Sequence, residues 1–396
     1  MELKENLSRR KFLSGTGGAL ALTPMALNRL DLPASMAAAA QSTTIIKRKL
    51  GRTGIEVPII SMGVAHTDNP AVVQESYKLG VRFFDTARRY SNGGNERMFG
   101  SAIRNLGVRN QVYVQTKADV LPMGQSTAEQ RKQNLLARFD ESLAALQMDY
   151  VDIFLLHGTS ANVSHMTDSG LKEGLAEIKK QKKARYLGIS AHVDQANALN
   201  IAVKEGIYDV ATISYNFTMV QDATLLNAIR NAAKAGIGII AMKTQAGGRA
   251  RPGEPPINHT AALKWVLRNE EIATAIPGYT NFDHMREDFS VATGLDYTDE
   301  EKKFLSGQNL RASVQFCQQC QTCRKNCPNG VDIPTLMRTY MYAAQYGNFV
   351  HARATLDEIA ANASLKNCAD CSYCNVKCAN YVSIADNIRD LKAMYL

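Results

Sequence analysis

Eight short apolar segments recur through the middle of this 396-residue chain, and helical patterns separate them. Within residues 126–146, for instance, apolar side chains recur at intervals of three and four residues, as on one face of a helix. Strands that alternate with helices pair in parallel, and eight such units in about 230 residues predict a closed (β/α)8 barrel. The predicted strands are residues 59–64, 81–84, 112–116, 151–156, 186–189, 210–214, 237–242 and 272–276.

Polar side chains stand at the ends of three neighbouring predicted strands. Asp85 ends the second, Lys117 the third and His157 the fourth, and Tyr90 lies in the loop after the second. Active sites of such barrels gather at the carboxyl ends of the strands. A tyrosine with a pKa near ~10 is a poor acid at neutral pH, but a cation held by a carboxylate can stabilise its phenolate. These four residues are the predicted catalytic group; an ordinary salt bridge with capping residues is the alternative.

The middle segment resembles the aldo-keto reductase family over roughly 250 residues. A β-hairpin is expected over residues 47–57, before the barrel. The motifs that carry the resemblance are Leu50-Gly51-Arg52-Thr53-Gly54, Phe84-Asp85-Thr86-Ala87 with Tyr90, Gly94-Asn95-Glu96, Thr116-Lys117, residues 152–157, Gly188-Ile189-Ser190, Tyr215-Asn216 and Ile276-Pro277-Gly278.

The resemblance implies a chemistry, since this family reduces carbonyl compounds with a nicotinamide cofactor. It implies that Tyr90 donates the proton, that Lys117 lowers the pKa of Tyr90, and that Asp85 pairs with Lys117. His157 would orient the carbonyl and stabilise the developing oxyanion.

The cofactor positions match the family less well. The resemblance implies that Tyr215 stacks on a nicotinamide ring, but Ala191 and Thr212 replace the asparagine and glutamine usual in the family. Asn281 and His284 stand where many members grip the adenosine phosphate with lysine and arginine, which weakens the expected hold on a 2′-phosphate. Alternatively, Lys243, Arg249 or Arg251 supplies the missing contacts. NADP(H) or NAD(H) is the nucleotide that the resemblance implies. The predicted nucleotide contacts are Ser190, Tyr215, Asn216, Lys243, Gly278, Thr280, Asn281, Glu287 and Asp288.

All eight cysteines lie in residues 311–396, in two runs that share the spacing C-x2-C-x2-C-x3-C. This doubled spacing resembles the two-cluster bacterial ferredoxins, in which the fourth cysteine of each run binds the other cluster. Zinc sites use separated cysteine pairs, and disulfides give no reason for a repeated spacing. The ligand sets implied for two 4Fe–4S clusters are Cys317, Cys320, Cys323 and Cys378, and Cys368, Cys371, Cys374 and Cys327.

Forty residues separate the two cysteine runs, which resembles the α-helical two-cluster ferredoxin domains. One helix is expected to begin at Ile333-Pro334 and another to span residues 350–361. Their apolar faces pack on each other or on the barrel. The expected fold is an α/β barrel at residues 45–310, followed by a mostly helical ferredoxin-like domain at residues 311–396.

The first forty residues resemble a twin-arginine export signal. Arg9 and Arg10 precede Phe12 and Leu13, an apolar stretch and a run of alanines that ends near Ala40. This predicts a periplasmic protein, exported folded by the twin-arginine machinery; a flexible basic tail is the alternative. Removing residues 1–40, with five basic and three acidic side chains, lowers the net charge from +9 to +7. No long basic tract with aromatics indicates nucleic-acid binding, and no apolar run reaches the ~20 residues of a membrane span.

These features together predict an exported iron–sulfur oxidoreductase that acts on a small carbonyl or alcohol substrate. Because clusters normally move single electrons and no flavin fingerprint follows any strand, we expect a separate redox partner protein. The ferredoxin-like domain is then expected near the barrel mouth that holds Tyr90 and His157. Two alternatives are an electron-transfer or binding protein whose barrel does not turn over, and a nicotinamide-dependent reductase with structural clusters.

Overall fold

The computed structural model describes residues 44–121, 123–158, 163–220, 222–246, 257–307, 317–318, 322–357, 359–371 and 373–396. The predicted export signal, Arg249, Arg251 and Cys320 lie outside the described residues.

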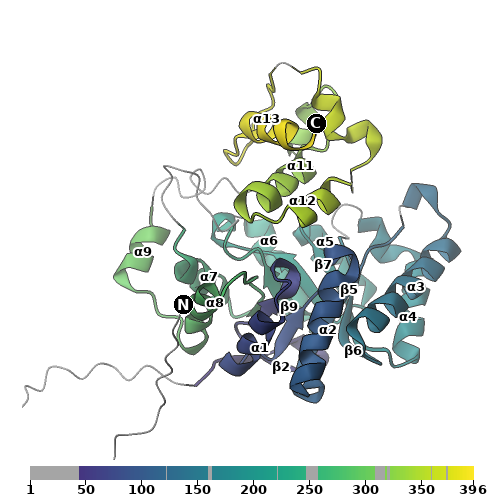
Figure 1. The fold of residues 1–396 in the computed structure, drawn as a ribbon, viewed down its shortest axis with the longest axis vertical. Coiled ribbons are helices and arrows are strands. Elements are labelled where there is room, and N and C mark those ends of the chain that lie inside the picture. The colour runs from purple at the N-terminus through teal and green to yellow at the C-terminus, as the bar shows by residue number, and fades with distance from the viewer. Residues whose placement is uncertain are drawn as a thin grey trace, which may run out of the picture. The chain divides into compact units, whose positions relative to one another are not determined.

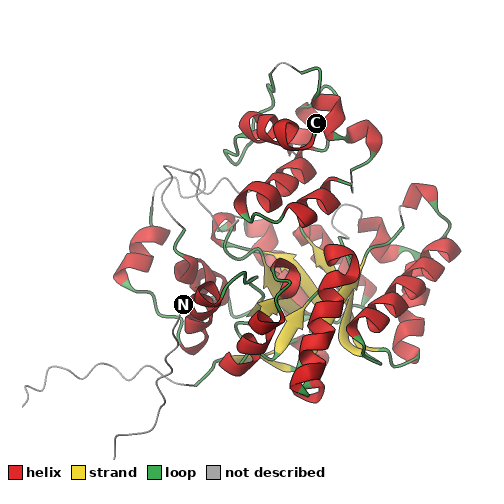
Figure 2. Ribbon diagram, in the orientation of Figure 1, coloured by secondary structure: helices red, strands yellow, loops and turns green. Residues whose placement is uncertain are grey.

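Eight parallel strands form the barrel, in the order in which they occur in the sequence (Figures 1 and 2). The first and last strands meet through bridges that join Ile60 to Ala275 and Gly63 to Gly278. The Ser61 amide donates to the Ala275 carbonyl at 2.8 Å, which closes the ring. All eight predicted strands are confirmed: β3 (Met62–Gly63), β4 (Phe83–Asp85), β5 (Tyr113–Ala118), β6 (Val151–Leu156), β7 (Ala184–Ala191), β8 (Val210–Ser214), β9 (Gly238–Met242) and β10 (Ile272–Ala275).

Helices surround these strands and cover their outer face (Figure 2). Their apolar faces share one core with the outward-facing strand residues, which is the packing expected of a parallel sheet. The helices are α1 (Pro70–Leu79), α2 (Gly94–Leu106), α3 (Ala128–Leu146), α4 (Ser169–Lys180), α5 (Gln195–Glu205), α6 (Ala223–Lys234), α7 (His259–Leu267), α8 (Phe282–Phe289) and α9 (Asp299–Leu305).

The predicted hairpin closes the amino-terminal end of the barrel. Strands β1 (Lys47–Lys49) and β2 (Glu56–Pro58) pair antiparallel, and Leu50 between them is fully buried in the barrel interior. Gly51 has a φ of 51°, and a Cβ there would come within 2.3 Å of the Gly238 nitrogen, so only glycine fits this approach. The opposite end, where the strands finish, is left for the site.

The C-terminal region, residues 317–396, contains α11 (Ile333–Tyr340), the π-helical turn η11 (Met341–Gln345), α12 (Phe349–Leu356) and α13 (Ile384–Tyr395). The second helix is shorter than predicted, because α12 ends at Leu356 and a separate turn covers Ala361–Ala363. Leu336 and Met337 pack inside the C-terminal region, whereas Tyr342 and Ala352 join the barrel core, so the predicted helices pack both ways. Within the described residues, no helix has the length and apolar character needed to cross a membrane.

Candidate active site

Asp85 and Lys117 form a buried ion pair at the carboxyl ends of β4 and β5. The Lys117 ammonium donates to both Asp85 oxygens, at 2.7 and 2.6 Å, and to the Thr86 carbonyl at 2.9 Å. Gln115 donates to the same carboxylate at 2.5 Å. An ammonium has three protons, so these three bonds use the donor capacity of Lys117. The pair is therefore a fixed charge element that is held by its own strands.

The loop after β4 holds Tyr90 through strained backbone and buried hydrogen bonds. Residues 91–93 have φ values of 50°, 51° and 78°, in the left-handed region that non-glycine residues avoid. Asn95 anchors the loop by donating to the carbonyl oxygens of Val64 and Thr67 at 2.9 and 3.0 Å. Strain of this kind persists where the surroundings enforce it, commonly at functional sites.

Whether Lys117 lowers the pKa of Tyr90, as the family resemblance implies, depends on how close the two side chains lie. Lys117 Nζ lies 5.3 Å from the Tyr90 ring centroid, and among the described residues no hydrogen bond joins the two side chains. Burial raises the pKa of Tyr90 well above its ordinary value, and the charge of Asp85 raises it further. Tyr90 is therefore protonated at neutral pH and can donate a proton, but the phenolate that remains is not stabilised by a direct bond from Lys117.

His157 follows β6 and faces Tyr90. The two rings are 5.9 Å apart between centroids and nearly perpendicular, at 86°. Burial lowers the pKa of His157 well below its ordinary value, and the charges of Arg89 and Lys117 lower it further, so the imidazole is neutral at pH 7. Asp119 Oδ1 lies 3.3 Å from Nδ1 of His157. A neutral imidazole can donate one N–H to a carbonyl oxygen, as carbonyl reduction requires.

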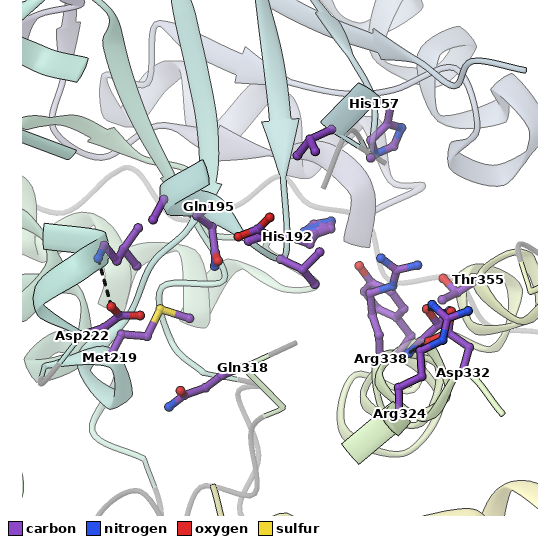
Figure 3. Close-up of a pocket in the computed structure, with 18 of the residues that line it drawn as sticks. His157, His192, Gln195, Met219, Asp222, Gln318, Arg324, Asp332, Arg338 and Thr355 are labelled. Atoms are coloured by element: carbon purple, nitrogen blue, oxygen red, sulfur yellow. Dashed lines mark hydrogen bonds between the residues drawn. The ribbon is translucent and has the colours of Figure 1, made fainter. Parts of the chain in front are cut away.

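A large cavity of about 750 Å³ opens beside these residues. Figure 3 shows His157 and His192 at the ends of barrel strands, with Arg338 and Asp332 on C-terminal helices across from them. The C-terminal region also touches the barrel directly, because Gln318 Nε2 donates to the Thr218 carbonyl at 3.1 Å. The region therefore lies at the barrel mouth, as the sequence analysis expected, and supplies part of the cavity wall.

The large cavity and the residues that line it form a chamber, and sequence reasoning missed four of these residues. His192 lies just beyond β7, and its place after a strand end was a usable signal. Arg338, Tyr342 and His351 come from the C-terminal region, and no local pattern connects them to a barrel loop 250 residues earlier. The ring of His351 lies 5.3 Å from that of Tyr90, between centroids. The chamber therefore belongs to both regions of the chain.

Seven of the eight cysteines are among the described residues, and none of these seven forms a disulfide. Burial and the charges of Cys327, Cys371 and Cys374 raise the pKa of Cys368 to about 11, so these four thiols lie near one another. The grouping crosses between the two runs, as in one of the predicted ligand sets. Asn329 Nδ2 lies 3.2 Å from the Cys371 sulfur, a contact of the kind that tunes cluster ligands.

A cluster fits this thiol group better than a single ion does. Among the described residues, no three His, Cys, Asp or Glu side chains converge as one metal ion requires. A 4Fe–4S cluster binds each thiolate to a different iron, which keeps the sulfurs further apart. Lys392 on α13 donates to the carbonyl oxygens of Cys368 and Cys371, at 2.9 and 3.2 Å, and so fixes the loop between them.

Residues 62–260, half of the chain, match the aldo/keto reductase family, and residues 316–383 match a 4Fe-4S dicluster domain. The chain belongs to the aldo/keto reductase family. L-galactose dehydrogenase of Arabidopsis thaliana is 28% identical over 301 residues, which cover 67% of this chain and 93% of that relative. L-glyceraldehyde 3-phosphate reductase of Escherichia coli O157:H7 is 24% identical over 316 residues, covering 64% and 89%.

Solved structures agree on the fold of this aldo/keto reductase. An aldo-keto reductase from Bacillus halodurans, in its holo form, matches with a TM-score of 0.55 at 20% identity and covers 66% of this chain and 95% of that one. A putative aldo-keto reductase from Pseudomonas aeruginosa matches with a TM-score of 0.51 at 24% identity, covering 63% and 94%. The protein is therefore an aldo/keto reductase-type oxidoreductase that also carries a 4Fe-4S dicluster domain.

A small cavity of about 310 Å³ adjoins the large one, and Tyr90, His192 and Tyr342 are among the residues that line both. Ligand pockets span roughly 300–1,000 Å³, so this one is at the low end. Five predicted nucleotide contacts line it, but Tyr342, Gln345 and His351 of the C-terminal region line it too. The five are Lys243, Gly278, Thr280, Glu287 and Asp288.

Among the described residues, the wall of this small cavity offers little of the cationic grip that the 2′-phosphate of NADP(H) needs. Asn281 starts α8, where its side chain accepts a hydrogen bond from the His284 amide at 2.9 Å. Glu287 adds negative charge to the cavity wall. The buried Asp288 accepts a hydrogen bond from Gln245 at 2.6 Å. No cationic side chain among the described residues replaces the lysine and arginine there, apart from Lys243. We therefore derive no catalytic step through this nucleotide.

Four predicted nucleotide contacts do not line either cavity: Ser190, Tyr215, Asn216 and Asn281. The ring of Tyr215, which the resemblance assigns to a nicotinamide stack, packs against Trp265 of α7, 5.1 Å away, and its hydroxyl meets Asn269. Asn216 instead supports the chamber indirectly by donating to the Lys243 carbonyl at 3.1 Å. Ser190 is buried within β7, beside Thr212 of β8.

Proposed function

We propose that this oxidoreductase is exported and interconverts a small carbonyl compound and its alcohol, with single electrons relayed by two 4Fe–4S clusters from a redox partner protein. The large cavity is the observation that carries this proposal. Tyr90 and His157 line its barrel side, and Gln318 and Arg324 line its C-terminal side. The latter two are the immediate sequence neighbours of Cys317 and Cys323. One open space is thus lined both by the proton donor and by sequence neighbours of the first cysteine run.

The proton chemistry follows from the chamber. A carbonyl oxygen placed between Tyr90 and His157 would accept a hydrogen bond from the neutral imidazole and a proton from the phenol. The Lys117 ammonium, held by its buried ion pair with Asp85, places a positive charge close to the Tyr90 ring. Arg89 adds a second cation near His157. Both charges favour the negative oxygen that develops as the carbonyl is reduced.

The electron count explains why a partner is part of the proposal. Two electrons and two protons convert a carbonyl into an alcohol. A hydride donor would supply both electrons and one proton, whereas single-electron donors leave both protons to the protein. Tyr90 then gives the proton to oxygen, and water in the large cavity gives the proton to carbon. A 4Fe–4S cluster, when bound, exchanges one electron at a time. Among the described residues, Lys243 is the one lysine or arginine that lines the small cavity, and this thin cationic lining favours the second route.

The first experiment uses the holoprotein purified without oxygen and a low-potential one-electron reductant. Because both relatives described above are named for small hydroxylated substrates, the test panel begins with sugar-type aldehydes. We expect reductant-dependent alcohol formation, and a Tyr90→Phe variant should slow it on the order of 10²–10⁴-fold while cluster absorbance is unchanged. A Tyr90→Phe variant as active as the parent would remove the phenol from the mechanism.

The same preparation separates the two alternatives. If the clusters are structural, a Cys317→Ala variant that lacks a cluster but keeps its fold turns over repeatedly with added NADPH. If the barrel is only a binding or electron-transfer module, the holoprotein reduces no member of the panel with either donor. Nicotinamide binding by the parent, measured by calorimetry, distinguishes these outcomes further.

Export is supported by the sequence of residues 1–40 alone. Replacement of Arg9 and Arg10 by lysine keeps the charge but removes the paired guanidinium groups. We expect the double variant to stay in the cytoplasm with its leader uncleaved, as measured by cell fractionation and the mass of the mature chain. Unchanged export of this variant would point to another route.

A further inference from the structure

Tyr342 lies in the π-helical turn η11 of the C-terminal region. Its side chain borders both the large and the small cavity. Its ring is 4% exposed and packs within the barrel core. The residues that border both cavities are few, and the barrel proton donor Tyr90 is another of them. Single π-helical turns inside helices are frequently found at functional sites.

Two ring contacts connect Tyr342 to Tyr90 through His351. The centroids of Tyr342 and His351 are 4.1 Å apart at an interplanar angle of 75°, and those of His351 and Tyr90 are 5.3 Å apart at 79°. His351 is buried on α12. Burial lowers the pKa of His351 well below its ordinary value, and Lys243 and Arg89 lower it further, so its ring is neutral. A neutral imidazole can accept a proton on one nitrogen while it releases one from the other.

Lys243 faces the Tyr342 ring from the end of β9. Its Nζ lies 4.3 Å from the ring centroid, so Tyr342 and Lys243 form a second phenol–ammonium pair beside Tyr90 and Lys117. Lys243 has a φ of 57°, a strained value for lysine, and Asn216 holds its carbonyl. The backbone is therefore constrained at the residue that carries this ammonium group.

The surroundings push the two phenols in opposite directions. Burial raises the pKa of Tyr90, with Asp85 and Tyr342 adding to it. Burial also opposes ionisation of Tyr342, but the charges of Lys243 and Arg338 outweigh it and lower the pKa of Tyr342 below its ordinary value. Such opposed shifts in neighbouring groups indicate which acts as the acid and which as the base. The titratable and charged groups around Tyr342 are Lys243 after β9, Arg338 on α11, Arg89 and Tyr90 after β4, His66 after β3, His351 on α12 and Tyr346 after η11.

We propose that Tyr342 is a second acid–base residue of the chamber, and that it returns a proton to Tyr90 through His351 after each turnover. The inference rests on the proposed carbonyl chemistry. Tyr90 gives its hydroxyl proton to the substrate oxygen and becomes a phenolate. His351 passes a proton to that phenolate and takes one from the Tyr342 hydroxyl. Tyr342, now the phenolate paired with Lys243, takes a proton from water in the large cavity, so one proton enters for each one delivered.

The first test measures ionisation directly and needs no substrate. Ultraviolet difference titration of the holoprotein compares tyrosinate absorbance in the parent with that in Tyr342→Phe and in Tyr346→Phe. Tyr346 is the matched control, because its ring also lies near Lys243, at 5.2 Å, whereas burial raises its pKa. The difference in tyrosinate absorbance between the parent and Tyr342→Phe should have a titration midpoint below the ordinary tyrosine value of about 10. The Lys243→Met substitution should move this midpoint above that value. A Tyr342 midpoint at or above about 10 in the parent overturns the proposal.

The second test separates a proton relay from a structural role. In Tyr342→Phe the first turnover should keep the parent rate, since Tyr90 begins protonated, and later turnovers should slow by roughly ten-fold. The alkaline limb of the pH–rate profile should also move, whereas Tyr346→Phe should keep the parent profile. Equal slowing of the first and later turnovers, or an unchanged profile, refutes the relay. A parent without turnover refutes the proposed function instead, and the titration still decides whether Tyr342 ionises as inferred.

Discussion

The barrel and the C-terminal region are built on cores of very different kinds. The barrel core draws apolar side chains from every strand and from the helices around them. The C-terminal region has a small apolar core whose edges are cysteines, with Cys323 and Cys368 inside it. Its main apolar members are Val331, Ile333, Leu336, Met337, Val382, Ile384, Ile388 and Leu391.

This difference predicts two sources of stability in one chain. Hydrophobic burial on the scale of the barrel can support folding by itself. A core as small as that of the C-terminal region usually needs a metal or cross-links, and metal binding then supplies folding free energy. The chamber lies where the two regions meet, so its geometry depends on the weaker one.

Removal of iron should have the largest effect and should divide the two regions. The holoprotein is expected to hold about eight iron atoms, and their removal under anaerobic conditions should unfold the C-terminal region entirely. Loss of helical circular dichroism and protease cleavage beyond residue 317 would measure this. Trp265, the single tryptophan of the chain, packs in the barrel against Tyr215 and reports on the barrel separately.

The expected result is an unchanged Trp265 emission spectrum while the C-terminal helices are lost. A red shift of that emission in step with iron loss would mean that the barrel, too, depends on the clusters. Retention of the helices after complete iron removal would show that the C-terminal core is sufficient without metal. Either outcome would contradict the division of stability drawn above.

Substitution of a single buried lysine should have the next largest effect, this time on the barrel. Lys117→Met leaves the Asp85 carboxylate buried without its cation, which typically destabilises a protein by about 3–5 kcal/mol. Urea unfolding followed by Trp265 emission should show this loss while cluster absorbance stays normal. Lys132→Met is the matched control, since its partner Glu173 is exposed and the pair lies on the surface.

The control variant should unfold at the urea concentration of the parent. If Lys117→Met did so as well, the Asp85 carboxylate would have to be protonated or rehydrated in the variant. A double variant, Asp85→Asn with Lys117→Met, should recover part of the lost stability, because no uncompensated charge then remains.

The barrel and its first functional residues were predictable because local rules place them. Buried parallel strands appear as apolar runs, and a parallel barrel brings the strand ends of Asp85, Lys117 and His157 to one mouth. The repeated cysteine spacing is likewise a local pattern with a chemical reason.

The remainder of the chamber was not predictable, since it depends on how two surfaces meet. Nothing near Tyr342 or His351 in the sequence indicates that they line the same cavity as Tyr90, which lies about 250 residues earlier. The role of Tyr215 was predicted from the family resemblance alone, which does not determine on which side the ring packs. The contact between Lys117 and Tyr90 was not predictable either, because it depends on how the fold uses the three ammonium protons of Lys117.

The smallest expected effect concerns the contact between the two regions, and it depends on pH. His351 is buried and neutral in the folded protein, with its pKa lowered by burial and then by Lys243 and Arg89. The unfolded chain therefore binds a proton below about pH 6.5 that the folded chain does not, and stability falls as pH drops through that value. Between pH 6.5 and 5.5 this residue should account for about 1 kcal/mol of lost stability.

In His351→Gln the urea midpoint of the anaerobic holoprotein should fall less steeply over this interval. The urea midpoint of each protein is compared with its own midpoint at pH 8, which separates the proton effect from any change in packing. If the urea midpoints of parent and variant fell equally steeply with pH, His351 would have to be hydrated or charged where the two regions meet.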